Sequence, residues 1–195
     1  KMFFDNLLHD GHPSENPWYA EDWAERYEGG KIVRSGWPME YMRDTLLPYK
    51  GMEKRNLILF PHRIAPEKQV EIFRDLKDQQ LTKNEYHNLL GEAKLVFSAN
   101  LQETLGISWY EGALVDAIPM VPNRLSYSEM ATDQFMYPSV WTEDFNSYIQ
   151  CRQFIVEKII DYMENYENYL PGLNTQVDIL TKNFFSCEGL LEKLK

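Results

Sequence analysis

The chain has 195 residues, of which 44% are hydrophobic, and a formal net charge of −10. That length suits one generous domain, or one domain with part of another, and the apolar content suits a packed core rather than a disordered segment. The acidic balance argues against a broad face that grips nucleic acid, because such affinity rests on clustered lysine and arginine.

Two further features of the composition indicate where the protein works. The longest aliphatic runs, such as Leu57–Phe60, fall far short of the roughly 20 residues that a bilayer crossing needs, and no charged-then-apolar leader opens the chain. Only Cys151 and Cys187 are present, at no metal-ligand spacing, which fits a reducing compartment. We therefore expect a soluble, cytoplasmic protein and, because the first residue is Lys1, an excerpt of a longer one.

The first part of the chain predicts short elements separated by turns. Residues 1–30 are rich in aromatics, acids and turn formers and are expected to form a connecting segment. The run at 57–60 is wholly apolar, as in a strand covered on both faces, and proline at 66 suits a helix start. The elements expected here are a short helix over Glu21–Glu28, a strand over Lys31–Arg34, a turn over Ser35–Met39, a strand over Leu57–Phe60, and a helix from Pro66 to Leu76.

The rest of the chain alternates strands and helices before it becomes wholly helical. The expected elements are a helix from the capping box Thr82–Glu85 through Ala93, a strand over Leu95–Ser98, a helix after Gly106, a strand over Ile118–Pro122, a helix start at Ser126–Met130, a long helix over Thr142–Asn168, a break at Pro171–Gly172 and a last helix over Gln176–Lys195. This alternation predicts an α/β protein with a parallel sheet covered by helices, followed by C-terminal helices. Ligands of such sheets bind at the carboxyl ends of the strands.

The most informative segment lies between Glu103 and Glu111, two carboxylates eight residues apart with Gly106 between them. It follows a predicted strand and leads into an apolar helix, so Gly106 is expected at the helix start. Amides there point outward unsatisfied, the dipole end is positive, and glycine lets a phosphate approach the backbone. Glu111, about two turns further, returns to a similar face. One segment is therefore expected to hold a diphosphate and two clusters of hydroxyl groups.

Three segments between Ile32 and Met130 follow a known family pattern in one consistent order. Val33–Pro38 looks like the family's short strand followed by Asn-Gly-Val-Asp. Phe60–Gln69 looks like its strand followed by Gly-Arg, a variable spacer and Glu-Lys-Gly. Phe97–Gly106 looks like its Pro-Ser-x-x-Glu-x-Phe-Gly segment. In this order they resemble the C-terminal, donor-binding half of the retaining GT-B-fold glycosyltransferases (glycosyl transferases group 1). The resemblance implies a Rossmann-like α/β domain that binds a nucleotide-sugar.

The resemblance also implies roles at the matching positions. The catalytic residues would be Arg63 and Lys68, which would clamp the donor diphosphate and neutralise the leaving group, and Glu103, which would bond hydroxyls of the transferred sugar. Glu111 would bond the ribose, and the other expected donor-binding residues are His62, Thr104, Leu105, Gly106 and Ile107. The side chains suit these roles, since the arginine fork fits paired phosphate oxygens and carboxylates accept from vicinal hydroxyls. No metal or cofactor is implied besides the nucleotide-sugar co-substrate, because cationic side chains and a helix terminus can stabilise the departing diphosphate.

The chain departs from the family pattern at three places. His62 stands where the family has a small residue, and Gln69 stands where it has glycine. The interval between Leu76 and Thr82 is too short for the strand and helix that relatives carry there, because a βαβ unit takes roughly 30 residues or more. Either the protein is trimmed, or a strand–helix unit near 77–81 is missing from the numbering. The expected division is 1–52 for the linker from and remnant of a preceding acceptor domain, 53–141 for the nucleotide-sugar-binding domain and 142–195 for the C-terminal helices.

The sequence thus predicts a glycosyltransferase that moves a sugar from a nucleotide-sugar to an acceptor with retention of configuration. The segments Val96–Gly106 and Pro122–Tyr127 are also similar to phage-type glycosyltransferases, some of which decorate hydroxymethylated pyrimidines in DNA. A nucleic-acid acceptor bound by the other domain, in host cytoplasm if the protein is phage-encoded, is therefore ranked slightly above a lipid or polysaccharide. Two alternatives stay open: a sugar-nucleotide-binding module without transfer activity, and a GT-B-fold epimerase. The oligomeric state is not readable from the sequence.

Overall fold

The structure is a computed structural model that describes residues 37–62, 66–73 and 82–188. Its centre is a four-stranded parallel sheet in the order β1-β2-β3-β4, formed by Arg55–Leu59, Ala93–Phe97, Ile118–Pro122 and Met136–Tyr137. The register pairs Leu59 with Val96 and Leu95 with Ile118. The α/β fold with a Rossmann-like parallel sheet followed by C-terminal helices, expected from the alternating pattern, is therefore confirmed. The expected elements at 21–28 and 31–34 lie outside the described residues.

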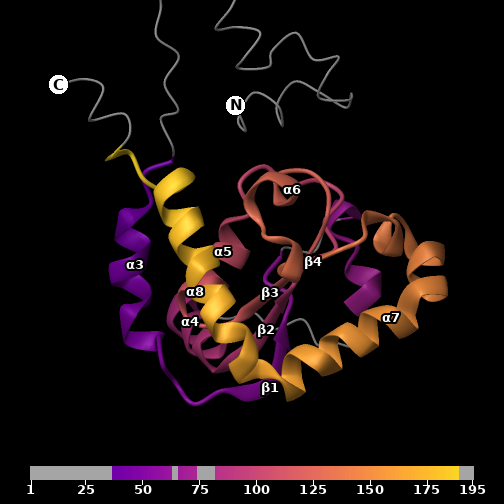
Figure 1. Cartoon of the computed structure of the whole chain (residues 1–195), viewed down its shortest axis with the longest axis horizontal. Coiled ribbons are helices and arrows are strands. Elements are labelled where there is room, and N and C mark those ends of the chain that lie inside the picture. Colours follow the sequence, from indigo (N-terminus) through magenta and orange to yellow (C-terminus); the bar gives the residue numbers. More distant parts are fainter. Residues whose placement is uncertain (1–36, 63–65, 74–81, 189–195) are drawn as a thin grey trace, which may run out of the picture.

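Helices connect and cover these strands. They are α3 (Glu40–Leu46), α4 (Lys83–Glu92), α5 (Ile107–Leu114), α6 (Tyr127–Met130), α7 (Phe145–Glu164) and α8 (Tyr166–Asn183), together with the short 3₁₀ helices η2 (Leu47–Tyr49), η3 (Pro66–Lys68), η4 (Val70–Phe73), η5 (Asp133–Phe135) and η6 (Ser139–Thr142). Figure 1 shows α3, α4, α5 and α8 gathered on one side of the sheet and α7 on the other. None of the helices in the described ranges is long and apolar enough to cross a membrane.

The burial of the strands follows their place in the sheet. All five residues of β3 are buried, as its continuous apolar sequence predicts for a strand with neighbours on both sides. The strand predicted at 57–60 is instead found at 55–59, and it is only half-buried. The expectation of a buried strand was wrong: Arg55 and Asn56 are exposed, and β1 is the edge strand of the described sheet, with one hydrogen-bonded neighbour.

Two helix predictions were wrong, for separate physical reasons. No continuous helix follows Pro66 within the described residues: η3 and η4 are separated by Gln69, whose φ of 54° is left-handed and cannot continue a right-handed helix. The predicted break at Pro171–Gly172 falls inside α8, and the chain breaks at Asn165 instead. A proline inside a helix costs roughly 3 kcal/mol, which the buried face of α8 outweighs through residues such as Leu173 and Leu180.

One hydrophobic core spans the described residues. It joins Leu46 of α3, the sheet, and Tyr162 and Leu180 of the C-terminal helices. The two ends of this unit meet: the amides of Trp37 and Met39 donate to the carbonyl oxygens of Phe184 and Phe185, at 2.8 and 3.3 Å. The parts assigned to 1–52, 53–141 and 142–195 therefore share packing wherever they are described.

A half-buried lysine, Lys54, connects the two helices α4 and α5. The ammonium of Lys54 donates to the carbonyl oxygens of Gly91, Ala93 and Val115, at 2.7, 3.0 and 2.5 Å. These carbonyls lie at the carboxyl ends of α4 and α5, where a positive charge is favoured by the helix dipole. Burial lowers the pKa of Lys54 to about 8, an effect that the carboxylate of Asp116 opposes. Lys54 thus fixes the spacing between α4 and α5.

Candidate functional site

The loop after β2 is shaped by Gly106, which is the N-cap of α5 as the sequence predicted. Gly106 has φ 64° and ψ 39°, the left-handed conformation that glycine adopts without steric cost. A Cβ atom at this position would collide with the indole of Trp109, so the backbone lies directly against a buried side chain. Glycine is therefore required here for its conformation and for the lack of a side chain.

The carboxylate of Glu103 folds back onto this helix start. The amides of Thr104 and Gly106 donate to Oε1 of Glu103 at 3.0 and 3.1 Å. The amides of Leu105, Gly106 and Ile107 were expected to support the phosphates or the sugar of the donor, but that of Gly106 is satisfied by the protein's own carboxylate. The amides of Leu105 and Ile107 donate to no acceptor within the described part of the chain.

The second oxygen of Glu103 faces cationic and amide donors. Asn100 Nδ2 donates to Oε2 at 3.0 Å, and Lys68 Nζ lies 3.5 Å from the same oxygen. Lys68 also donates to the carbonyl oxygen of Gln102 at 2.7 Å. The side chains of Lys68 and Glu103 are only 13% and 15% exposed, so this ion pair is partly shielded from water. Two of the three residues expected to be catalytic therefore lie together, and the third, Arg63, lies outside the described residues.

Glu111 occupies the second turn of α5 and is paired with a residue from another helix. The hydroxyl of Tyr86, on α4, donates to Glu111 Oε2 at 2.9 Å. Burial raises the pKa of the Glu111 carboxyl, and the hydrogen bond from Tyr86 and the charge of Lys83 oppose that rise. Burial, with the nearby Glu111 charge, also raises the pKa of the Tyr86 phenol, so Tyr86 stays a donor at neutral pH.

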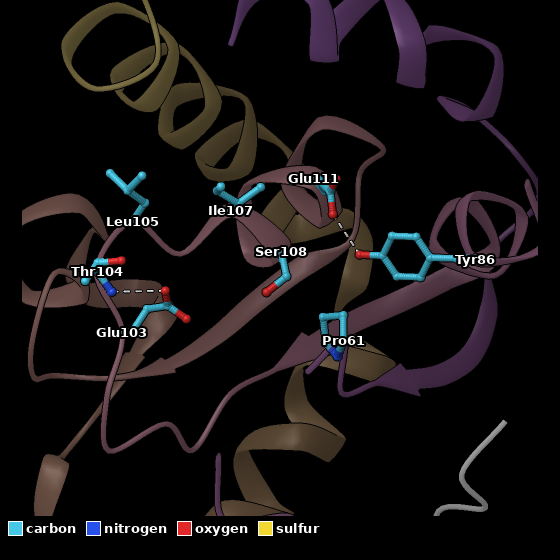
Figure 2. A pocket seen from close by; sticks show the side chains of 8 residues that line it. All are labelled: Pro61, Tyr86, Glu103, Thr104, Leu105, Ile107, Ser108 and Glu111. Atoms are coloured by element: carbon cyan, nitrogen blue, oxygen red, sulfur yellow. Dashed lines mark hydrogen bonds between the residues drawn. The ribbon is translucent and has the colours of Figure 1, made fainter. Parts of the chain in front are cut away.

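Both glutamates line a single cavity of about 420 Å³, shown in Figure 2. The lining residues are Pro61, Tyr86, Glu103, Thr104, Leu105, Ile107, Ser108 and Glu111. Pro61 follows β1 and the 103–108 loop follows β2, so the cavity opens at the carboxyl ends of two neighbouring parallel strands. Figure 2 shows the Ser108 hydroxyl in the interval between the two carboxylates. The cavity therefore offers two acceptors, a hydroxyl and apolar walls to one ligand.

The lining set agrees in part with the sequence prediction. Five expected residues line the cavity: Glu103, Thr104, Leu105, Ile107 and Glu111. Gly106 and Lys68 act next to it, on Glu103. The sequence reasoning missed Pro61, Ser108 and Tyr86. Ser108 stands inside the recognised segment, so the sequence offered a signal for it. Tyr86 reaches Glu111 only through the packing of α4 on α5, for which the sequence gives no signal.

His62 is not among the residues that line the cavity. Its ring packs edge-on against Phe60, with ring centroids 4.7 Å apart, and its Nδ1 is 3.5 Å from Asn100 Nδ2. Burial lowers the pKa of His62 to about 4, the charge of Lys68 adds to this, and Glu103 opposes it. His62 is therefore neutral at physiological pH and packs locally, and its expected role in donor binding stays a prediction.

Asn100 links this region to a buried polar network. Its Nδ2 also donates to the hydroxyl of Tyr127 at 3.1 Å, and that hydroxyl shares a 2.9 Å hydrogen bond with Ser98 Oγ. Asn100, Ser98 and Tyr127 are each fully buried. The network holds the loop after β2 against α6, which gives Glu103 a rigid support.

Gln69 stands where the family resemblance expects glycine, and its backbone has the conformation that favours glycine. Its φ of 54° is left-handed, a conformation that glycine adopts most readily. The buried side chain compensates, since Nε2 donates to the carbonyl oxygens of Ala99 and Thr142 at 2.7 and 2.5 Å. The glutamine thus holds a glycine-type turn next to Lys68.

Comparison with known proteins leaves the family open. A scan against protein-family models gave no match, and a search of curated proteins gave no significant relative. Fold and cavity define an α/β protein with a cavity at the carboxyl ends of two neighbouring parallel strands. Any closer assignment rests on the residues of this chain.

Proposed function

We propose that the protein is a nucleotide-sugar-dependent, configuration-retaining glycosyltransferase and that the 420 Å³ cavity holds part of its donor. The observation that carries the proposal is the convergence of Glu103 and Glu111 on one cavity. The two residues were selected from sequence spacing for hydroxyl recognition, and their carboxylates are acceptors suited to vicinal hydroxyls. Small-molecule sites commonly measure about 300–1,000 Å³, so the cavity has a suitable size.

The expected chemistry is a displacement at the anomeric carbon of the donor sugar. The bond between that carbon and the diphosphate oxygen breaks, and the acceptor hydroxyl forms the new bond on the same face. The hydroxyl proton leaves with the nucleoside diphosphate. Charge grows on the diphosphate as this happens, so a preorganised cation such as Lys68 stabilises the transition state more than the ground state. Arg63 is the second cation that the family resemblance supplies.

Two conformational features support the resemblance. Gly106 has a positive φ at the start of α5, as expected for the glycine that ends the third family segment. Gln69 has a positive φ directly after Lys68, where the family pattern has glycine. A substituted residue that keeps the glycine conformation supports a shared backbone course in that turn. The proposed acceptor is a hydroxyl on nucleic acid, such as a hydroxymethylated pyrimidine in phage DNA, and the proposed location is the cytoplasm.

One observation favours a second function, a sugar-nucleotide-binding module without transfer. Glu103 already bonds the amides of Thr104 and Gly106, so its carboxylate has a structural role in the described structure. A residue committed in this way can shape a binding pocket without taking part in chemistry. The glycosyltransferase and the binding module would bind the same nucleotide-sugar, but only the glycosyltransferase would turn it over.

The test is a binding and turnover assay on the purified protein. A panel of nucleotide-sugars is titrated by calorimetry, and release of nucleoside diphosphate is followed with and without hydroxymethylated DNA. The proposal predicts saturable binding of at least one nucleotide-sugar and acceptor-dependent release of its diphosphate. Binding without release would support the module, and absence of binding across the panel would overturn both.

A matched pair of variants ties the result to the cavity. Glu111→Gln keeps an oxygen for the Tyr86 hydroxyl and removes the charge, so donor binding is expected to weaken. Glu157→Gln makes the same change on the exposed face of α7, where Glu157 accepts a hydrogen bond from Gln153, and is expected to bind as the wild type. Equal binding by both variants would remove Glu111 from the proposed site.

A further inference from the structure

The contact between α4 and α5 places an aromatic residue in the cavity wall that no sequence motif assigns. Tyr86 contributes its side chain to the wall, and its hydroxyl ends on Glu111 Oε2. Figure 2 shows the ring extending from one helix and the carboxylate from the other, meeting at that hydrogen bond. The two residues are 25 positions apart in the chain, so only the folded structure brings them together.

The backbones of Tyr86 and Glu111 are each held by further contacts of their helices. The Thr82–Glu85 capping box fixes the first turn of α4, and the Tyr86 amide donates to the Thr82 carbonyl oxygen at 2.9 Å. Next to Glu111, a Cβ on Gly112 would come within 2.5 Å of Val96 Cγ2, so α5 sits close against β2. Neither backbone can shift freely, and the side-chain hydrogen bond therefore has a fixed geometry.

The hydrogen bond uses one of the two carboxylate oxygens. Glu111 Oε2 accepts from Tyr86, while Oε1 accepts no hydrogen bond from the described residues, and the residue lines the cavity. A bound hydroxyl group can therefore add to the carboxylate without displacing Tyr86. An orientated acceptor costs less conformational entropy on binding than a free side chain does.

We propose that Tyr86 is a positioning residue for the donor: it orients Glu111 so that the free carboxylate oxygen accepts hydrogen bonds from the ribose hydroxyls of a nucleotide. The inference rests on the proposed function and deepens it, because it assigns a residue to one ligand moiety. It predicts that Tyr86 contributes to binding only when those hydroxyls are present.

The test compares two ligands on two proteins. Wild type and Tyr86→Phe are titrated with a nucleoside diphosphate and with its 2′,3′-dideoxy analogue, using the base that the wild type binds most tightly. Tyr86→Phe keeps the ring and removes the hydroxyl. We expect it to bind the ribonucleotide about tenfold more weakly, the loss of one hydrogen bond to a charged group, and to bind the dideoxy analogue as the wild type does. Equal weakening for both ligands, or for neither, would overturn the inference.

The pH profile gives a second readout that a purely structural role would not move. The Glu111 carboxyl accepts hydrogen bonds more strongly when it is ionised. Burial raises its pKa, and Tyr86 and Lys83 of α4 oppose that rise. Without the Tyr86 hydroxyl the pKa rises further. The pH at which ribonucleotide binding is half lost on acidification should therefore move upward in Tyr86→Phe, whereas an unchanged midpoint would contradict the proposed role.

A control variant removes a comparable hydroxyl elsewhere. The Tyr166 hydroxyl donates to the carbonyl oxygen of Asp116 at 2.6 Å, and Tyr166 does not line the cavity. Tyr166→Phe should leave the ratio of the two affinities unchanged, and thermal unfolding of both variants checks that they fold. If the wild type binds no nucleotide, the proposed function and this inference fail together; if it binds but Tyr86→Phe has no selective effect, only the inference fails.

Discussion

The carboxylate of Glu103 accepts a hydrogen bond from the amide of Gly106 at 3.1 Å, so the loop after β2 closes on the start of its own helix. This contact joins the two residues that the sequence marked for different ligand groups. The loop that carries Glu103 at the cavity therefore has its conformation before a ligand binds. Because this loop and its contacts are preorganised, the effects of several substitutions on stability and ligand binding can be predicted.

Replacing Glu103 is expected to lower stability as well as ligand binding. Oε1 accepts from two amides and Oε2 from Asn100, with Lys68 beside it, so both oxygens must be acceptors. Glu103→Gln would place an amide nitrogen against other donors. We expect Glu103→Gln and Glu103→Ala each to lose about 1–3 kcal/mol of unfolding free energy in urea titrations. A glutamine variant as stable as the wild type would show that the carboxylate contacts contribute nothing.

Two glycine substitutions separate backbone strain from steric collision. Gly51 has φ 74° and open space where a Cβ atom would stand, whereas Gly106 has φ 64° and the Trp109 indole in that place. Gly51→Ala should cost about 1 kcal/mol, the left-handed penalty alone. Gly106→Ala should cost roughly 1–3 kcal/mol more, because a packed side chain must move. Equal urea midpoints for the two variants would contradict the packing at Gly106.

Gln69 offers a test of a left-handed residue that is not glycine. Gln69→Gly and Gln69→Ala both lose the hydrogen bonds to Ala99 and Thr142, but only alanine keeps the steric cost of the φ of 54°. We therefore expect the glycine variant to be more stable than the alanine variant by about 1 kcal/mol, measured by chemical denaturation. The reverse order would mean that the backbone at 69 is not left-handed in solution.

The pKa of His62 predicts an acid-side loss of stability. The folded pKa is about 4 against an ordinary value of 6.5, so between these values the unfolded chain binds more protons than the folded one. The unfolding free energy should fall as pH drops from about 6.5 to about 4, by at most about 3 kcal/mol from this group. His62→Gln should flatten that part of the curve relative to the wild type. Parallel curves for the two proteins would show that folding does not lower the pKa of His62.

Lys54 should prove essential to the spacing of α4 and α5. Lys54→Met preserves the apolar stem but leaves the carbonyls of Gly91, Ala93 and Val115 without their shared donor. We expect a loss of about 2–4 kcal/mol in unfolding free energy. Lys50→Met is the matched control, because Lys50 is more exposed and only pairs with Asp116 at 3.5 Å. Similar effects of the two changes would refute the role of Lys54.

The parts of the fold that followed from sequence are those determined by neighbouring residues. The strand at 118–122 is a continuous apolar run, the capping box at 82–85 satisfies its own helix start, and Gly106 has the conformation its position requires. Each depends on a few adjacent side chains. The α/β class then follows from the alternation of such local elements.

The parts that did not follow depend on contacts between distant residues. Pro171 stays helical because α8 is buried along one face, and the turn at Gln69 is held by carbonyls 30 and 73 positions away. The same holds in the candidate site. Glu103 and Glu111 share a segment and were found together, whereas Tyr86 entered the cavity through the packing of α4 on α5.

The hydrogen bonds that join Trp37 and Met39 to Phe184 and Phe185 also have a mechanical meaning. A third bond, from the Cys187 amide to Glu40 Oε1 at 2.9 Å, lies beside them. Tension applied between residues 37 and 188 would act first on these three hydrogen bonds. The helix that carries Glu111 lies next to these hydrogen bonds, because the ring of Tyr110 in α5 stacks on Phe185 with ring centroids 4.2 Å apart, so a force on the two ends of the unit reaches an element of the cavity directly.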